Sequence, residues 1–139
     1  MIEYHYQTDF KLEGEKHFTD WITRVIKTET RDLGPLAYIF CSDESMLEMN
    51  KKYLDHDTFT DIITFDYTEG EELSGDIFIS TDRLRENAAT FGVSFREEVL
   101  RVMVHGVLHL MGYKDKTDKD KTLMRNKENE MIALFHVEH

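Results

Sequence analysis

The order of apolar and polar positions along the chain predicts a mixture of helices and strands. Apolar residues recur at the spacing of an amphipathic helix over 15–30. Apolar runs and runs rich in β-branched and aromatic residues indicate strands instead, and these lie at 2–7, 36–41, 62–67 and 75–80. The pair Gly34-Pro35 is expected to break the chain before the second of these strands.

Residues that cap helix N-termini precede the remaining helical segments. We expect helices at about 43–54, 81–91, 94–111 and 118–135, with caps at Ser42 or Asp43, at Thr81, at Ser94 paired with Glu97, and at Thr117 or Asp118. Strands and helices are mixed, and several helices follow one another near the C-terminus. This order predicts an α+β fold in a single domain over 1–139, with one mixed sheet of about four strands and helices packed mainly on one face.

Composition narrows the class of protein. A chain of 139 residues, 40% hydrophobic and 32% charged, is typical of one soluble domain. No apolar run is long enough to cross a membrane, and the first residues lack the basic and apolar regions of a signal peptide. Cys41 is the only cysteine, which excludes an intrachain disulfide and a cysteine-rich zinc cluster. We therefore expect a cytoplasmic protein with no membrane partner.

Two histidines four residues apart lie within the long helix predicted in the C-terminal half of the chain. His105 and His109 project from one face of that helix and can chelate one ion. Gly112 ends the helix and lets the chain double back, which brings Asp115 within reach of the same ion. Three protein ligands leave a coordination position for water, as in catalytic zinc sites. The residues therefore predict one Zn²⁺ at His105, His109 and Asp115.

The neighbours of the two histidines bear on this prediction. The pair could instead be core or surface histidines of an amphipathic helix. The segment is almost entirely apolar, however, and partly buried imidazoles need a partner, which a metal or solvent at a cleft wall can supply. Gly106 stands where a zinc peptidase with this spacing carries its glutamate base. A glycine in a helix can also admit close approach of a backbone or a bulky substrate.

The charge of the chain has two aspects. The formal net charge of −11 by itself argues against nucleic-acid binding. The segment 114–127 nevertheless has six basic residues and three acidic ones, so it is locally +3. It is either a solvated, mixed-charge start of a helix or a basic rim beside the metal site.

The run from His105 to Asp115 resembles the signature of the YbeY family of bacterial endoribonucleases, which act in ribosomal RNA maturation. That signature reads His-Gly-x-Leu-His-Leu-x-Gly-Tyr-Asp-His, and its fixed positions hold here through Tyr113. Lys114 then replaces Asp, and Asp115 replaces His. Three further segments resemble blocks of the family, and these are Asn50-Lys51-Lys52-Tyr53, Thr60-Asp61-Ile62-Ile63-Thr64-Phe65 and Gly75-Asp76-Ile77.

Two departures from the family pattern affect the expected site. Aspartate is a competent zinc ligand, so Asp115 is carried over as the third ligand, although a carboxylate shifts preference toward harder ions such as Mn²⁺ or Fe²⁺. Leu54 stands where the family has an arginine, and leucine cannot contact a phosphate. Lys51, Lys52 or His56 are candidates to replace it, and the sequence does not identify a general base.

The resemblance implies a single-strand-specific, metal-dependent endoribonuclease in ribosomal RNA maturation and ribosome quality control. His105, His109 and Asp115 would then act through the metal. The implied partners are ribosomal RNA, a small-subunit ribosomal protein and a ribosome-associated GTPase. Leu54 leaves open a non-catalytic ribosome-assembly factor with a structural metal. A third alternative is another metallohydrolase such as a peptidase, against which Gly106 speaks.

Several other residues have both a structural and a functional interpretation. Thr60-Asp61 either starts a strand or lines a cleft, and Asp76 is either a surface aspartate or a hydrogen-bond acceptor for a ligand histidine. Arg83 and Arg85 lie in the first turn of a predicted helix, where the dipole disfavours cations, which hints at a phosphate or acidic partner. His136 and His139 are expected to be exposed.

Overall fold

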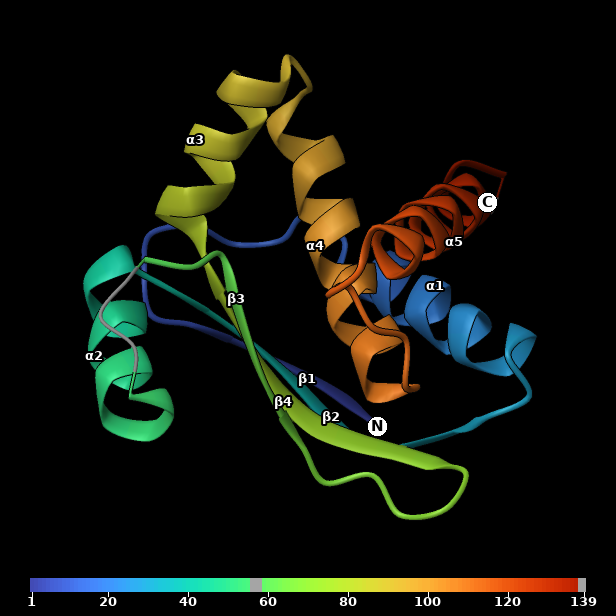
Figure 1. Cartoon of the computed structure of the whole chain (residues 1–139). Coiled ribbons are helices and arrows are strands. Elements are labelled where there is room, and N and C mark those ends of the chain that lie inside the picture. Colours follow the sequence, from blue (N-terminus) through green and yellow to red (C-terminus); the bar gives the residue numbers. More distant parts are fainter. Residues whose placement is uncertain (56–58, 138–139) are drawn as a thin grey trace.

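A computed structural model describes residues 1–55 and 59–137 (Figure 1). The elements of this part of the chain are β1 (Ile2–Tyr6), α1 (Glu15–Thr28), β2 (Asp32–Cys41), α2 (Asp43–Leu54), β3 (Ile62–Asp66), β4 (Glu72–Ser80), α3 (Thr81–Phe91), α4 (Phe95–Leu110) and α5 (Asp118–Val137). Within these residues no helix is both long and apolar enough to span a bilayer.

The four strands form one mixed sheet in the order β1-β2-β4-β3. β1 and β4 both run parallel to β2, and β3 pairs with β4 in the antiparallel sense. The predicted α+β class and the mixed four-stranded sheet are therefore confirmed.

The helices form two unequal layers around the sheet. α1, α4 and α5 cover one face, and α2 lies against the other (Figure 1). Side chains alternate accordingly along β2, where Tyr38 and Phe40 belong to the main core and Cys41 to the smaller cluster under α2. Trp21 of α1 is fully buried, and its indole N–H donates to the carbonyl of Met131 at 2.8 Å. The prediction that helices pack mainly on one face is thus confirmed.

Two local predictions were wrong. β2 does not break at Gly34-Pro35 but runs through it, with an irregular register between Leu33 and Leu36 that accommodates a residue without an N–H. A Cβ at Gly34 would lie 2.6 Å from the carbonyl oxygen of Leu73, so the close approach of the two strands requires glycine there.

The second error concerns the start of α3. Its cap is Ser80, whose hydroxyl accepts from the backbone N–H of Arg83 at 3.1 Å. Thr81 is instead the first helical residue and is buried, and its hydroxyl donates to the carbonyl of Cys41. The last residue of β4 therefore caps the helix that follows without an intervening loop.

α4 lies directly against the sheet because of Gly106. A Cβ at this position would lie 2.9 Å from Cγ2 of Ile77 and 3.0 Å from Cδ1 of Ile62. The glycine therefore admits side chains of β3 and β4, rather than a backbone or a substrate. The close packing fixes the rotation of α4 about its axis, and with it the direction of the flanking histidines.

Candidate metal centre

Three side chains converge at the C-terminal end of α4. His105 and His109 lie on consecutive turns, and Gly112, at φ 103°, reverses the chain so that Asp115 returns toward them. One Asp115 carboxylate oxygen lies 3.3 Å from Nε2 of His105 and 3.5 Å from Nε2 of His109. The three candidate ligand atoms lie within 4.8 Å of one another. The structure thus brings together the three residues that the sequence indicates as metal ligands.

The other nitrogen of each imidazole ring has a partner of its own. Nδ1 of His105 lies 2.6 Å from a carboxylate oxygen of Glu128, and Nδ1 of His109 lies 3.0 Å from the carbonyl oxygen of Tyr113. Both partners can only accept, so each Nδ1 carries the proton and donates. In the neutral ring each Nε2 then keeps its lone pair, and both Nε2 atoms lie close to the Asp115 carboxylate, as in the carboxylate–histidine–metal arrangement. The donor set therefore fits a divalent transition metal.

Glu128 was not found from the sequence. Asp76, considered there as the acceptor for a ligand histidine, lies in β4 opposite Ala37 and Phe65, and the acceptors are Glu128 and a carbonyl instead. A signal was nevertheless present, because the buried face of α5 is otherwise apolar and repeats through Met124, Glu128, Met131, Ile132 and Phe135. An acid in such a stripe needs a partner.

Glu128 joins the candidate metal centre to a neighbouring cation. Its side chain is 6% exposed, and its second carboxylate oxygen accepts from Arg101 Nη1 at 2.9 Å. Burial alone would raise the pKa of Glu128, but the hydrogen bonds from His105 and Arg101 outweigh it and hold this pKa below its usual value. Burial alone would lower the pKa of His105, because it disfavours the charged ring. The contact with Glu128 outweighs this effect, so the pKa of His105 is raised.

The three candidate ligands form part of the wall of a cleft of about 430 Å³. Thr60 and Asp61 line the same cleft, which agrees with the cleft role considered for them rather than with the start of a strand. Burial raises the pKa of Asp61, against the influence of His105, which lowers it. The cations among the lining residues are Arg101 and Arg125. The cleft therefore combines a candidate metal site with carboxyl and guanidinium groups.

The candidates to replace the missing family arginine do not meet at this cleft. Leu54 is 44% exposed at the end of α2, and the described residues that line the cleft include none from α2, where Lys51 and Lys52 also lie. His56 lies outside the described residues. Arg101, which sequence analysis did not single out, and Arg125 are the guanidinium groups that the fold places there instead.

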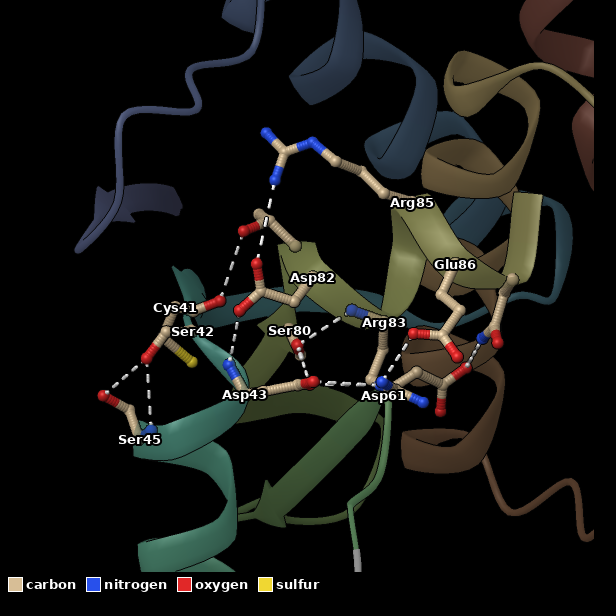
Figure 2. Close-up of polar contacts among 12 residues, drawn as sticks. Cys41, Ser42, Asp43, Ser45, Asp61, Ser80, Asp82, Arg83, Arg85 and Glu86 are labelled. Carbon is tan, nitrogen blue, oxygen red and sulfur yellow. Dashed lines mark hydrogen bonds and ion pairs between the residues drawn. The ribbon is translucent and has the colours of Figure 1, made fainter. Parts of the chain in front are cut away.

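Several of the remaining sequence candidates have partners within the protein. Arg83 binds the carboxylate of Asp43 at 3.1 Å and that of Glu86 at 2.8 Å, so its acidic partners lie within the protein (Figure 2). His136 is half exposed and lies 3.0 Å from Glu97, and His139 lies outside the described residues. Within the basic segment 114–127, Arg125 lines the cleft, whereas Lys127 binds the carboxylate of Glu29 at 3.1 Å.

Comparison with known proteins gives consistent matches over almost the whole chain. The family described as Endoribonuclease YbeY matches residues 3–136. Proteins named Endoribonuclease YbeY from Flavobacterium johnsoniae and Flavobacterium psychrophilum are 56% and 53% identical, over 99% of this chain in both cases and 99% and 98% of their own lengths. The solution structure of TM1509 from Thermotoga maritima superposes with a TM-score of 0.70 at 28% identity, covering 97% of this chain and 89% of that one.

Proposed function

Because the chain belongs to the YbeY endoribonuclease family, we propose that it is a metal-dependent endoribonuclease that cleaves single-stranded ribosomal RNA during rRNA maturation and ribosome quality control. One observation carries the metal dependence. The Asp115 carboxylate faces the Nε2 atoms of His105 and His109, while both Nδ1 atoms are held by acceptors.

In this proposal His105, His109 and Asp115 hold one Zn²⁺, or a harder ion such as Mn²⁺ or Fe²⁺. The ion, when bound, supplies a Lewis acid and lowers the pKa of a bound water toward ~7. Glu128 holds the ring of His105 in the orientation that ligation needs. Arg125 attracts the phosphodiester into the cleft and offsets its negative charge during cleavage.

The alternatives differ in what they require of particular residues. A peptidase of the two-histidine helical type needs a glutamate at position 106, but a side chain there would collide with Ile77 and Ile62. A non-catalytic ribosome-assembly factor with a structural metal keeps the support of Leu54, which cannot replace an arginine at a phosphate. The open cleft beside a three-ligand set favours the catalytic alternative, because structural zinc sites are usually closed by a fourth ligand.

The wider setting is proposed on the family resemblance. We expect the chain to act as one domain over 1–139 in the cytoplasm, on ribosomal RNA. Contacts with a small-subunit ribosomal protein and a ribosome-associated GTPase are part of the same proposal.

Cleavage of a labelled single-stranded oligoribonucleotide by the zinc-loaded protein tests the function. We expect His109→Ala and Asp115→Ala to lose activity by at least about 100-fold, because each removes a ligand. Asp118→Ala, which changes an acid in the first turn of α5, is the matched control and should cleave normally. A duplex of the same sequence should resist cleavage.

The outcomes separate the alternatives. Equal cleavage by all the variants would mean that the activity comes from a contaminant, and the nuclease proposal would fail. Normal zinc binding without cleavage would favour the assembly factor. A purified protein with no transition metal and no affinity for zinc would overturn the metal centre itself.

A further inference from the structure

An exposed aromatic ring lies at the cleft that holds the candidate metal ligands. Phe91, the last residue of α3, is 60% exposed and lines this cleft together with His105 and Arg125. It also lines an adjoining hollow of about 300 Å³, which shares Arg101 and Arg125 with the cleft. The two hollows therefore adjoin, and Phe91 borders both.

The cleft follows α4 for much of its length. Its lining residues on this helix run from Glu98 to His109, which at 1.5 Å per residue corresponds to about 16 Å. A single phosphodiester at the metal centre would leave most of this length unused. The remainder has the dimensions of a track for the nucleotides that flank the cleaved bond.

The exposure of Phe91 has no structural explanation among the described residues. Two of the four exposed aromatic rings in the described part of the chain have a partner, since Tyr53 contacts the ring of Phe65 and Phe59 contacts the guanidinium of Arg83. Within 1–55 and 59–137, Phe91 has neither an aromatic nor a cation–π contact. The turn that ends α3 also does not need the ring, because it is closed by backbone bonds from Gly92 and Val93.

A cation lines the same two hollows as this ring. Arg125 is exposed, and no ion pair engages it in the described part of the chain. Arg101, by contrast, is bound to Glu128 and Asn129. A guanidinium without an ion pair and an unpartnered aromatic face in the same hollow are the combination that binds a phosphate and the base attached to it.

We propose that Phe91 is a stacking platform for an unpaired base of the RNA next to the cleaved phosphodiester, with Arg125 contacting the phosphate between that base and the metal centre. This inference rests on the proposed function and adds a binding site to it. It also gives a physical cause for single-strand specificity, since a base within a duplex already stacks on its neighbours and cannot offer its face to the ring.

The balance of charge explains why a stacking contact is needed. The adjoining hollow is lined by Glu97 and Glu98 as well as by the two arginines, so its electrostatic attraction for a phosphate is weak. Stacking does not depend on net charge. The contribution of Phe91 to affinity should therefore persist at high salt, whereas that of Arg125 should fall as salt is raised.

The test is a double-mutant cycle between the ring and the base. Zinc-loaded full-length protein in excess is mixed with a fluorescein-labelled single-stranded oligoribonucleotide, and anisotropy is followed by stopped flow. The early amplitude gives affinity and the later decay gives the cleavage rate. A set of oligoribonucleotides, each lacking one base, locates the position that meets the ring.

Phe91→Ala should weaken binding by about 5- to 150-fold, the range that corresponds to loss of one base–aromatic stack. Phe91→Trp should restore it. Removal of one particular base should cause a similar loss in the wild type and little further loss in Phe91→Ala. Tyr67→Ala is the matched control, because Tyr67 is 57% exposed and lies outside the cleft lining, and it should bind like the wild type.

Two results would overturn the inference, namely wild-type affinity in Phe91→Ala, or equal sensitivity of Phe91→Ala and the wild type to every missing base. Either result with a wild type that cleaves RNA leaves the proposed function intact. A wild type that binds RNA without cleaving it refutes the nuclease, yet the cycle still decides whether the ring stacks. A wild type that neither binds nor cleaves RNA refutes both proposals.

Discussion

Replacing Glu128 by glutamine removes the negative charge between His105 and Arg101 and keeps the shape of the side chain. The two hydrogen bonds of Glu128, 2.6 and 2.9 Å long, both involve charged or chargeable partners at a side chain that is 6% exposed. An amide cannot accept from both partners as strongly, so the ring of His105 becomes less firmly oriented. We expect Glu128→Gln to lower zinc affinity by about 10- to 100-fold, which is typical for partners of metal ligands.

Replacement by alanine should have a larger effect on stability. Loss of one member of a buried ion pair costs about 3–5 kcal/mol, because it leaves the other group without a partner. Arg101 keeps its bond to Asn129, so a value near the lower end is expected for Glu128→Ala. At about 2–4 °C per kcal/mol for a domain of this size, the midpoint of thermal unfolding should fall by roughly 6–12 °C.

The pH dependence of this contribution follows from the lowered pKa of Glu128. In the metal-free protein its stabilising effect is complete above the pKa of an unfolded carboxyl group, and it is lost as the pH falls through the lower pKa of the folded state. The raised pKa of His105 acts in the opposite sense, and its contribution is lost as the pH rises through that value. The difference in unfolding free energy between the wild type and Glu128→Gln should therefore narrow as the pH falls through the pKa of Glu128, and narrow again as the pH rises through the pKa of His105.

Competition with a chromogenic chelator measures zinc affinity, and thermal unfolding with and without zinc measures stability. Glu130→Gln changes an exposed acid two residues further along α5 and controls for the general effect of charge. If Glu128→Gln binds zinc as tightly as Glu130→Gln does, the orientation of His105 does not depend on Glu128, and the interpretation of this contact is wrong.

Three further results are expected. Asp115→His, which restores the usual family ligand, should keep zinc affinity within about tenfold of the wild type in the same chelator assay, whereas Asp115→Ala should lose it; wild-type zinc affinity in Asp115→Ala would exclude Asp115 as a ligand. Gly106→Ala should destabilise the fold by about 1–3 kcal/mol in denaturant unfolding, because overpacking against Ile77 exceeds the gain in helix propensity; a more stable variant would contradict this packing. Glu29→Gln should destabilise the fold at neutral pH and match the wild type in acid. The reason is that the hydrogen bonds of Glu29 with Tyr113 and Lys127 lower its pKa by more than burial raises it. A pH-independent difference in unfolding free energy would count against the ion pair.

The sequence by itself determined what depends on short separations along the chain. Helical spacing placed His105 and His109 on one face, and Gly112 made it possible for Asp115 to return to them. Apolar runs and runs rich in β-branched and aromatic residues indicated the strands of the mixed sheet, although they did not show that β2 passes through Gly34-Pro35. These features were predictable because backbone geometry fixes the period of side chains in a helix or strand.

The tertiary structure alone decided which distant residues complete the site. Glu128 reaches His105 from another helix, and Phe91 and Arg125 enter the cleft from two different elements, whereas the end of α2 that carries Leu54 stays outside its described lining. Such contacts depend on how α3, α4 and α5 pack, and that packing is set by close contacts such as those of Gly106 with the sheet. No period in the sequence records the rotation of one helix against another, so the convergence of the three candidate metal ligands could be predicted while the residues that orient them could not.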